Sequence, residues 1–430
     1  MNSPQQGQIQ PLINLYQQGQ LQQALDSTKQ LLKQFPNSLI LYNIQGAANA
    51  GLGQFDAAID SYKQALKIKP DYAEAYNNMG DALKLSGELE AAIDSFKQAL
   101  KIKPDFAEAY SNMGNALKDK GDLDASIESY KNAIKIKPDY AKAYNNMGIA
   151  LFNKGDLEAA INSYQQALLI QPDYAEAYNN MGASQKEKDD LEAAIDSFKQ
   201  ALSIQPDYAE AYNNMGNTLQ DMGDLEAAIE SFKKALSIKP DSAEAHNNLG
   251  NALKDKGDID GAIDNFERAL KIKPDLVEAY NNMGAALKSK GDLEAAVNSY
   301  QQAIKIDPNY AEAYSNMGVA LMDKGDLEAA INCHKQALKI KPDYAEVYNN
   351  MGAALKDKGD IEAAIDSYKQ AIKIKPDYAL AYTNMGAALE KQDKLEEALD
   401  LYKRALCQLP KVYEHPYAFY RGQIYQKIWD

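Results

Sequence analysis

A proline recurs every 34 residues through almost the whole chain. A fixed period of this length is typical of a solenoid, in which each repeat buries its apolar faces only against its neighbours. With this proline at position 32, twelve repeats fill residues 5–412 of the 430-residue chain. The period therefore overrides the estimate of about three domains that length alone suggests. The prolines are Pro36, Pro70, Pro104, Pro138, Pro172, Pro206, Pro240, Pro274, Pro308, Pro342, Pro376 and Pro410.

The third repeat, residues 73–106, contains two apolar stripes at helical spacing. The first stripe consists of Tyr76, Met79, Gly80 and Leu83, and the second of Leu89, Ala92, Ile93, Phe96, Ala99 and Leu100. Gly87 lies between them and suits a helix end, since glycine readily takes a positive φ. Each repeat is therefore predicted to be two antiparallel helices of about 12–14 residues.

Two patterns predict where these helices begin. Asp71 followed by Glu74 is typical of a capping box for the first helix. An acidic residue after the glycine, Glu88 here and Asp in most other repeats, is expected to cap the second helix.

This pattern resembles the tetratricopeptide repeat over residues 5–412. The matching residues are Tyr76, Met79, Gly80, Leu83, Ala92, Phe96, Ala99 and Pro104, with Met and Leu in place of the usual Leu and Tyr. The chain is similar to the repeat region of O-linked N-acetylglucosamine transferases and to bacterial multi-repeat proteins. The resemblance implies an all-α, right-handed superhelical solenoid of about twelve helix-turn-helix repeats. It also implies that the first helices line a concave groove that binds peptides or proteins.

The two ends depart from the repeat pattern. Residues 1–38 are predicted to be a degenerate first repeat or N-terminal cap, because Gln8, Pro11 and Thr28 replace pattern residues. Residues 39–412 form the array of eleven repeats. Residues 413–430 are predicted to be a C-terminal capping helix, since proline at 416 suits a first helical turn. A docking site and a remnant of a longer protein are the alternatives for this segment.

Position 6 of repeats three to twelve is always asparagine, a poor residue inside a helix. One hypothesis is a ladder of amides that clamps the backbone of an extended peptide, similar to the ladder in the groove of O-linked N-acetylglucosamine transferases. The alternative is a structural bond to the neighbouring repeat, or copying by duplication. The candidate groove residues are Asn78, Asn112, Asn146, Asn180, Asn214, Asn248, Asn282, Asn316, Asn350 and Asn384.

Two repeats place apolar residues at groove positions 9 and 12, where most others have Asn or Ala followed by Lys. These residues are Ile149 and Phe152 in the fifth repeat and Val319 and Met322 in the tenth. They are candidate pockets for ligand side chains. The alternative is that they are isolated surface hydrophobics, which are normal.

Position 2 is mostly glutamate, which indicates either an acidic groove rim that favours basic segments or simple helix capping. Tetratricopeptide domains that hold acidic C-termini use Lys or Arg at positions 2 and 6. Because these columns are mostly Glu and Asn here, we expect no carboxylate-clamp ligand. The expected partners are protein or peptide ligands with basic or neutral extended segments.

The composition argues against several other partners. A net charge of −15 disfavours nucleic acid and anionic membranes. No apolar run of about 18 residues predicts a membrane span, and the first residues do not have the pattern of an export signal. Two cysteines fit a reducing compartment. We therefore expect a cytoplasmic protein.

No residue pattern predicts catalysis, a cofactor or a metal site. Cys333 and His334 are adjacent, so their side chains diverge on a helix and cannot form a nucleophile–base pair. His246 and His334 replace aromatic residues of the repeat and are predicted to pack between helices. Neither C-x-x-C nor H-E-x-x-H occurs. The chain is therefore not expected to be an enzyme.

The main functional hypothesis is a non-catalytic scaffold for protein–protein interaction. The alternative is the substrate-recruiting arm of a glycosyltransferase or sulfotransferase whose catalytic domain is on another chain or missing, since only residues 413–430 follow the last repeat. A third possibility is a structural protein that associates end to end.

Two turns carry substitutions that should weaken the array. The sixth repeat has Gln185 in place of Leu and Asp189 in place of Gly, and the twelfth has Asp393 at the same turn position. A residue other than glycine in such a turn costs about 1 kcal/mol. We therefore expect the array to open first around residues 183–192.

Overall fold

The structure is a computed structural model that describes residues 4–408. This part of the chain is all-α, with 24 helices paired as twelve helix-turn-helix repeats, so the predicted fold class is confirmed. The chain divides into two compact units, Met1–Thr218 and Leu219–Asp430. The capping helix predicted for residues 413–430 lies outside the described residues.

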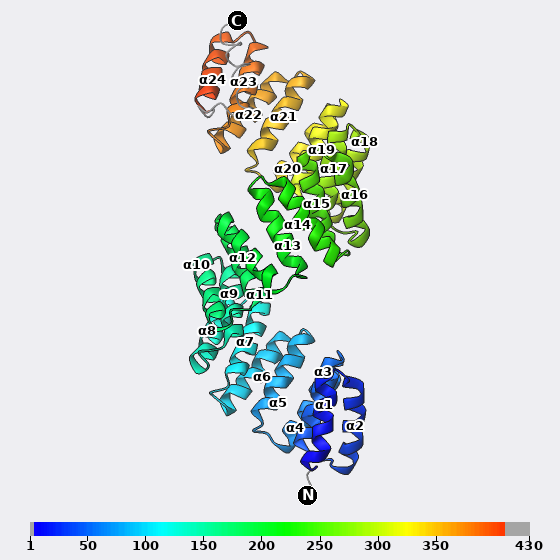
Figure 1. Ribbon diagram of the computed structural model, residues 1–430. Coiled ribbons are helices and arrows are strands. Elements are labelled where there is room, and N and C mark those ends of the chain that lie inside the picture. The colour runs from blue at the N-terminus through cyan, green and yellow to red at the C-terminus, as the bar shows by residue number, and fades with distance from the viewer. Residues whose placement is uncertain (1–3, 409–430) are drawn as a thin grey trace. The chain divides into compact units, whose positions relative to one another are not determined.

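Within each unit the helices follow one another in chain order (Figure 1). The first unit contains α1 (Gln6–Gln17), α2 (Leu21–Gln34), α3 (Leu39–Gly51), α4 (Phe55–Ile68), α5 (Ala73–Leu85), α6 (Leu89–Ile102), α7 (Ala107–Lys120), α8 (Leu123–Ile136), α9 (Ala141–Lys154), α10 (Leu157–Ile170), α11 (Ala175–Glu187) and α12 (Leu191–Ile204). The boundary between the units lies inside α13 (Ala209–Asp221). The second unit continues with α14 (Leu225–Ile238), α15 (Ala243–Lys256), α16 (Ile259–Ile272), α17 (Val277–Lys290), α18 (Leu293–Ile306), α19 (Ala311–Lys324), α20 (Leu327–Ile340), α21 (Ala345–Lys358), α22 (Ile361–Ile374), α23 (Ala379–Glu390) and α24 (Leu395–Gln408).

The turn inside most repeats is built from a glycine and an acidic residue that follows it. Gly121 has a φ of 90°, which glycine adopts without steric cost. Asp122 follows it and accepts a hydrogen bond from the backbone N–H of Ala125 at 3.2 Å, which satisfies a free donor at the start of α8. The cap expected from an aspartate at this position is therefore confirmed in this repeat, whereas Glu88 at the start of α6 makes no side-chain capping hydrogen bond.

The predicted capping box of the first helix is wrong. The N-cap of α5 is Tyr72, and its side chain makes no capping hydrogen bond. Because the helix begins at Ala73, Asp71 lies one residue too early to cap it. Glu74 instead forms an ion pair with Lys103 at 3.6 Å.

The core of most repeats depends on the contact between the glycine at position 8 and the ring of the residue at position 24. In the fifth repeat Gly148 on α9 faces the buried ring of Tyr164 on α10. Alanines surround the ring, and Ala150, Ala160 and Ala167 are fully buried. Small residues at these places let the two helices approach closely, which explains why the repeat keeps them.

The first helices lie on the more closely spaced side of the stack in each unit. In the first unit α5 contacts α7 as well as its partner α6, and α7 contacts α9. The described second helices make no comparable contacts with each other. The positions of a first helix that face away from its partner helix therefore form the inner surface of each unit.

The two predicted turn defects are present. Asp189 and Asp393 have φ values of 66° and 62°, and among the described residues they are the non-glycine residues with positive φ. Gln185, in place of the usual leucine, accepts a hydrogen bond from Ser197 Oγ at 2.6 Å. The polar substitution on α11 is thus partly compensated on α12.

Candidate functional site

The candidate binding surface consists of positions 2, 5, 6, 9, 12 and 13 of the first helices, here called the first-helix face. These positions lie opposite the apolar stripe that packs on the second helix. Each first helix therefore presents one row of side chains, and adjacent repeats bring equivalent rows side by side. The contacts within these rows decide which groups remain for a ligand.

The asparagines at position 6 form hydrogen bonds between repeats. Asn180 donates from its side-chain amide to Asn145 Oδ1 at 3.1 Å, and Asn145 is fully buried at position 5 of the preceding repeat. The same bond joins Asn78 to Asn43, Asn112 to Asn77, Asn214 to Asn179, Asn282 to Asn247, Asn316 to Asn281, and Asn384 to Asn349. One N–H of each of these amides therefore links neighbouring repeats.

Three of the predicted asparagines form a different hydrogen bond. Asn146 donates to Asn115 Oδ1 at 3.0 Å, because Asn115 at position 9 reaches the same donor. Asn248 and Asn350 accept hydrogen bonds from the asparagines that precede them, Asn247 and Asn349. The column is thus continuous in sequence but not uniform in its bonding.

The glutamates at position 2 extend this network. Asn145, Asn179 and Asn281 each donate to the glutamate of the next repeat at 3.2 Å, and their acceptors are Glu176, Glu210 and Glu312. Glu346, like Glu74, instead pairs with a lysine of its own repeat, Lys375, at 3.5 Å. The acidic column therefore contacts neighbouring side chains in place of the predicted capping role.

The apolar candidates are half-buried. Ile149 and Phe152 lie on α9 and pack against the core cluster that includes Leu151. Met322 on α19 packs in the same way against a cluster in the second unit, and Val319 is also half-buried. These side chains therefore offer part of their surface to the first-helix face and are held by the core behind them.

Asp81 at position 9 of the third repeat was not singled out from the sequence. It accepts a hydrogen bond from Asn112 Nδ2 at 3.0 Å. Burial raises the pKa of its carboxyl to about 6, while Lys84 and Lys142 oppose the shift. The sequence does distinguish Asp81, because position 9 is a neutral residue in every other repeat.

Both helical histidines pack as predicted. His246 is buried, with Nδ1 3.0 Å from Asn265 Oδ1 and Nε2 3.2 Å from the carbonyl oxygen of Pro240. His334 is fully buried, and neither ring nitrogen has a hydrogen-bond partner. Burial raises the pKa of the neighbouring Cys333 thiol to about 11, which leaves it protonated and unreactive near neutral pH.

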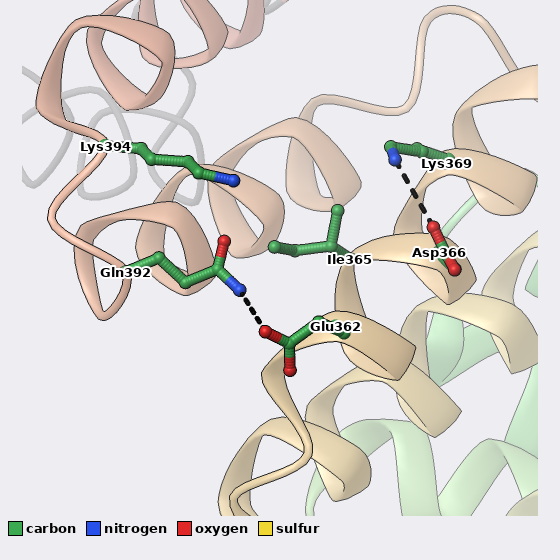
Figure 2. Close-up of a pocket in the computed structure, with 6 residues that line it drawn as sticks. All are labelled: Glu362, Ile365, Asp366, Lys369, Gln392 and Lys394. Atoms are coloured by element: carbon green, nitrogen blue, oxygen red, sulfur yellow. Dashed lines mark hydrogen bonds and ion pairs between the residues drawn. The ribbon is translucent and has the colours of Figure 1, made fainter.

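A cleft of about 600 Å³ lies between α22 and the turn that leads into α24 (Figure 2). Gln392 donates to Glu362 across it at 2.9 Å, and Lys369 pairs with Asp366 at 3.3 Å. The cleft belongs to the turn edge of the second unit and not to the first-helix face. These two pairs do not form a nucleophile–base arrangement.

Residues 4–408 contain neither a metal-binding cluster nor a membrane-spanning helix. No group of three or more His, Cys, Asp or Glu side chains in this range could hold a metal ion. In the same range no helix has the length and apolar character needed to cross a lipid bilayer.

Sequence profiles of known families match most of the chain. A TPR repeat profile matches residues 46–87, 80–121, 114–155, 150–189 and 186–223, and a tetratricopeptide repeat profile matches residues 13–38. The profile of the cilia and flagella-associated protein 70 C-terminal domain matches residues 207–416. None of these profiles describes a catalytic domain. A search of curated proteins gave no match.

Several solved structures are similar to parts of the chain. MamA is 31% identical, with a TM-score of 0.35, over 37% of this chain and 94% of its own. YrrB, described as a TPR protein with an unusual peptide-binding site, is 26% identical, with a TM-score of 0.37, over 46% of this chain and 99% of its own. The APC/C hetero-tetramer Cut9–Hcn1 is 14% identical, with a TM-score of 0.49, over 97% of this chain and 94% of the matched chain.

Proposed function

The chain is a tetratricopeptide repeat protein, and we propose that it acts as a non-catalytic scaffold that binds extended segments of other proteins on the first-helix face. The observation that carries the proposal is the departure of α9 from the repeat pattern. Lys142, Ile149 and Phe152 share this face of α9, where the other repeats mostly have glutamate, a small or polar residue, and lysine. Departures at exposed positions of an otherwise uniform array indicate where a partner is chosen.

The partly buried apolar pair supports side-chain recognition. Ile149 and Phe152 are held by the core cluster behind them, so they present a rigid apolar surface among polar neighbours. Such anchored apolar side chains contribute most of the binding energy at many interfaces. Val319 and Met322 would serve a second segment in the C-terminal unit.

The asparagine column would contact the backbone of the bound segment. A side-chain amide has two N–H groups and one acceptor oxygen. Asn180 uses one N–H in its bond to Asn145, which fixes the orientation of the remaining groups. We propose that the position-6 asparagines bind main-chain amides with the side-chain amide groups that remain. These asparagines are Asn78, Asn112, Asn146, Asn180, Asn214, Asn248, Asn282, Asn316, Asn350 and Asn384.

The test is a pair of substitutions within the fifth repeat. Phe152→Lys introduces the residue that the third and fourth repeats carry at this position, Lys84 and Lys118. Leu169→Lys, on the second helix, removes a leucine that is 74% exposed and also introduces a residue used by other repeats. Both variants are therefore expected to fold. Each would serve as bait for capture of partners from the native lysate, with mass spectrometry as the readout.

We expect Phe152→Lys to lose partners that Leu169→Lys retains. Equal retention by both baits would contradict a partner site on the first-helix face. Capture of a glycosyltransferase or sulfotransferase that depends on Phe152 would favour the second hypothesis, in which this chain recruits substrates for an enzyme on another chain.

The match of residues 207–416 supports one further candidate role, that of a ciliary or flagellar component. The matched residues are repeats of the array, so this candidate concerns the place where the scaffold works and not its chemistry. We propose the cytoplasm as its general location on the basis of its composition. Imaging of the tagged protein in cells would separate a ciliary location from a general cytoplasmic one.

A further inference from the structure

A lysine lies over the aromatic residue that ends a repeat in five of the twelve repeats. The lysine is at position 31, and the aromatic residue at position 34 precedes the next first helix. The distances from Nζ to the ring centroid are 5.7 Å for Lys69 and Tyr72, 4.4 Å for Lys103 and Phe106, 4.9 Å for Lys137 and Tyr140, 4.7 Å for Lys341 and Tyr344, and 5.3 Å for Lys375 and Tyr378. These are cation–π distances, so the ring is an established cation site within this protein.

Two consecutive repeats keep the tyrosine but lack the lysine. Gln171 precedes Tyr174 and Gln205 precedes Tyr208, at the positions that hold lysine in the five repeats above. Both tyrosines are half-buried and both glutamines are exposed. In the described part of the chain no other ammonium group takes the place of the lysine over either ring.

A carboxylate accompanies each of these two rings. Glu176 and Glu210 follow the tyrosines by two residues and are exposed. After burial, Glu176 is the main group that raises the pKa of Tyr174, to about 12. Burial raises the pKa of Tyr208 as well, and Glu210 and Glu176 both add to this shift. The two rings and the two carboxylates are therefore close enough to act on one another.

Glu176 also lacks a lysine that compensates the equivalent glutamate in other repeats, whereas Glu210 shares its repeat with Lys239. Glu74 pairs with Lys103 and Glu346 pairs with Lys375, in each case the position-31 lysine of the same repeat. For Glu176 the equivalent residue is Gln205, which carries no charge. Glu176 accepts a hydrogen bond from the neutral amide of Asn145 at 3.2 Å. The missing lysine thus leaves a vacant cation position beside both an aromatic face and a carboxylate.

We propose that Tyr174, Glu176, Tyr208 and Glu210 form a site for lysine or arginine side chains of an extended partner segment. The partner's cations would occupy the place that the chain's own lysines fill in five other repeats. This inference rests on the proposed function and adds to it the chemistry of the partner, a segment with basic residues that lie near one another.

The decisive variant returns the missing lysines to the chain. Gln171→Lys combined with Gln205→Lys would place ammonium groups over Tyr174 and Tyr208 without removing any residue of the site. Since five repeats already have this arrangement, the variant is expected to fold. The control, Gln165→Lys with Ser203→Lys, adds the same charge to α10 and α12 at exposed positions that other repeats also fill with lysine.

The probe is a fluorescent peptide in which lysines alternate with glycine and serine, measured by fluorescence anisotropy at low salt. We expect it to bind the wild-type protein about tenfold more tightly than the Gln171→Lys and Gln205→Lys variant, with a change of less than about twofold in the control. Glu176→Gln with Glu210→Gln keeps the acceptors of the asparagine bonds and should also lose affinity.

Three results would overturn the proposal. These are no binding of the lysine peptide to the wild-type protein, equal affinity for both lysine variants, and equal binding of a peptide with glutamine in place of lysine. The proposed function is judged separately by the Phe152→Lys bait. Suppose that the Phe152→Lys bait loses its partners, while the Gln171→Lys and Gln205→Lys variant still captures these partners and still binds the lysine peptide. The scaffold role then stands and the basic-segment site is wrong.

Discussion

Gly148 on α9 lies so close to Tyr164 on α10 that a Cβ atom at Gly148 would fall 2.5 Å from Tyr164 Cε1. Tyr164 is almost fully buried, so its ring has no free space into which it could move. Substitution Gly148→Ala must therefore displace the ring or separate the two helices. We expect it to lower the free energy of unfolding by about 2 kcal/mol, measured by urea denaturation followed by circular dichroism.

Gly155→Ala in the same repeat is the control for backbone strain. Gly155 has a φ of 85°, but a Cβ there would meet no atom within 4 Å. The cost should come from the backbone alone, about 1 kcal/mol. A larger effect at Gly155 than at Gly148 would show that close helix approach does not limit the residue at position 8.

His334 is expected to destabilise its repeat. The imidazole is fully buried and neither of its nitrogens is hydrogen-bonded, whereas Phe96 and Phe266 occupy the same position in other repeats. Removal of two unpaired buried polar atoms favours the folded state. We predict that His334→Phe raises the free energy of unfolding by about 1–2 kcal/mol, with the largest increase in hydrogen-exchange protection in α20. Reduced protection in α20 would contradict this account.

The same histidine makes stability depend on pH. Burial lowers the pKa of His334 from 6.5 to about 4, so between these values the unfolded chain binds a proton that the folded chain does not. The free energy of unfolding is therefore highest above pH 6.5 and falls by up to about 3 kcal/mol as the pH falls toward 4. Urea denaturation at several pH values should show this loss in the wild-type protein and a smaller loss in His334→Phe.

The fold could be predicted from the sequence because its signals repeat. A single substitution such as Asp189 for glycine did not obscure the turn, since the other repeats specify it. The error at the first helix has a local cause. Asp71 has the right chemistry for a cap, but the aromatic Tyr72 occupies the N-cap position, and the spacing alone did not distinguish the two.

The site could be predicted less well, because its contacts join different repeats. Asn180 and Asn145 are 35 residues apart, and no local pattern specifies that one amide donates to the other. The pKa of Asp81 likewise depends on contacts beyond its own helix, because burial raises it and Lys142, in another repeat, opposes the shift. The bonds between repeats follow from the register of stacking, which the sequence implies only through the fold.

Asp189 should mark the weakest turn of the N-terminal unit. Its φ of 66° costs about 1 kcal/mol in a residue with a Cβ. Hydrogen exchange is expected to be fastest around residues 183–192 among the turns of repeats two to six. Asp189→Gly should restore protection there by about fivefold, since glycine takes this backbone conformation without strain. Uniform protection in the wild-type turns would contradict the prediction.

The hydrogen bond from Asn180 to Asn145 allows the two hypotheses for the asparagine column to be separated. Asn180→Ala removes the donor and leaves the oxygen of a fully buried amide without this partner. We expect the free energy of unfolding to fall by about 1 kcal/mol, as measured by urea denaturation. Asn162→Ala changes an exposed asparagine on α10, outside the first-helix face, and should alter the free energy of unfolding by less than about 0.5 kcal/mol.

Partner capture with the same two variants then gives the second readout. A bond that only joins repeats would lower stability without changing the partners captured under conditions in which the variant is folded. A column that also binds a segment backbone would lose partners in the Asn180→Ala bait and keep them in the Asn162→Ala bait. Unchanged stability together with lost partners would assign Asn180 to ligand binding alone, which the 3.1 Å bond to Asn145 argues against.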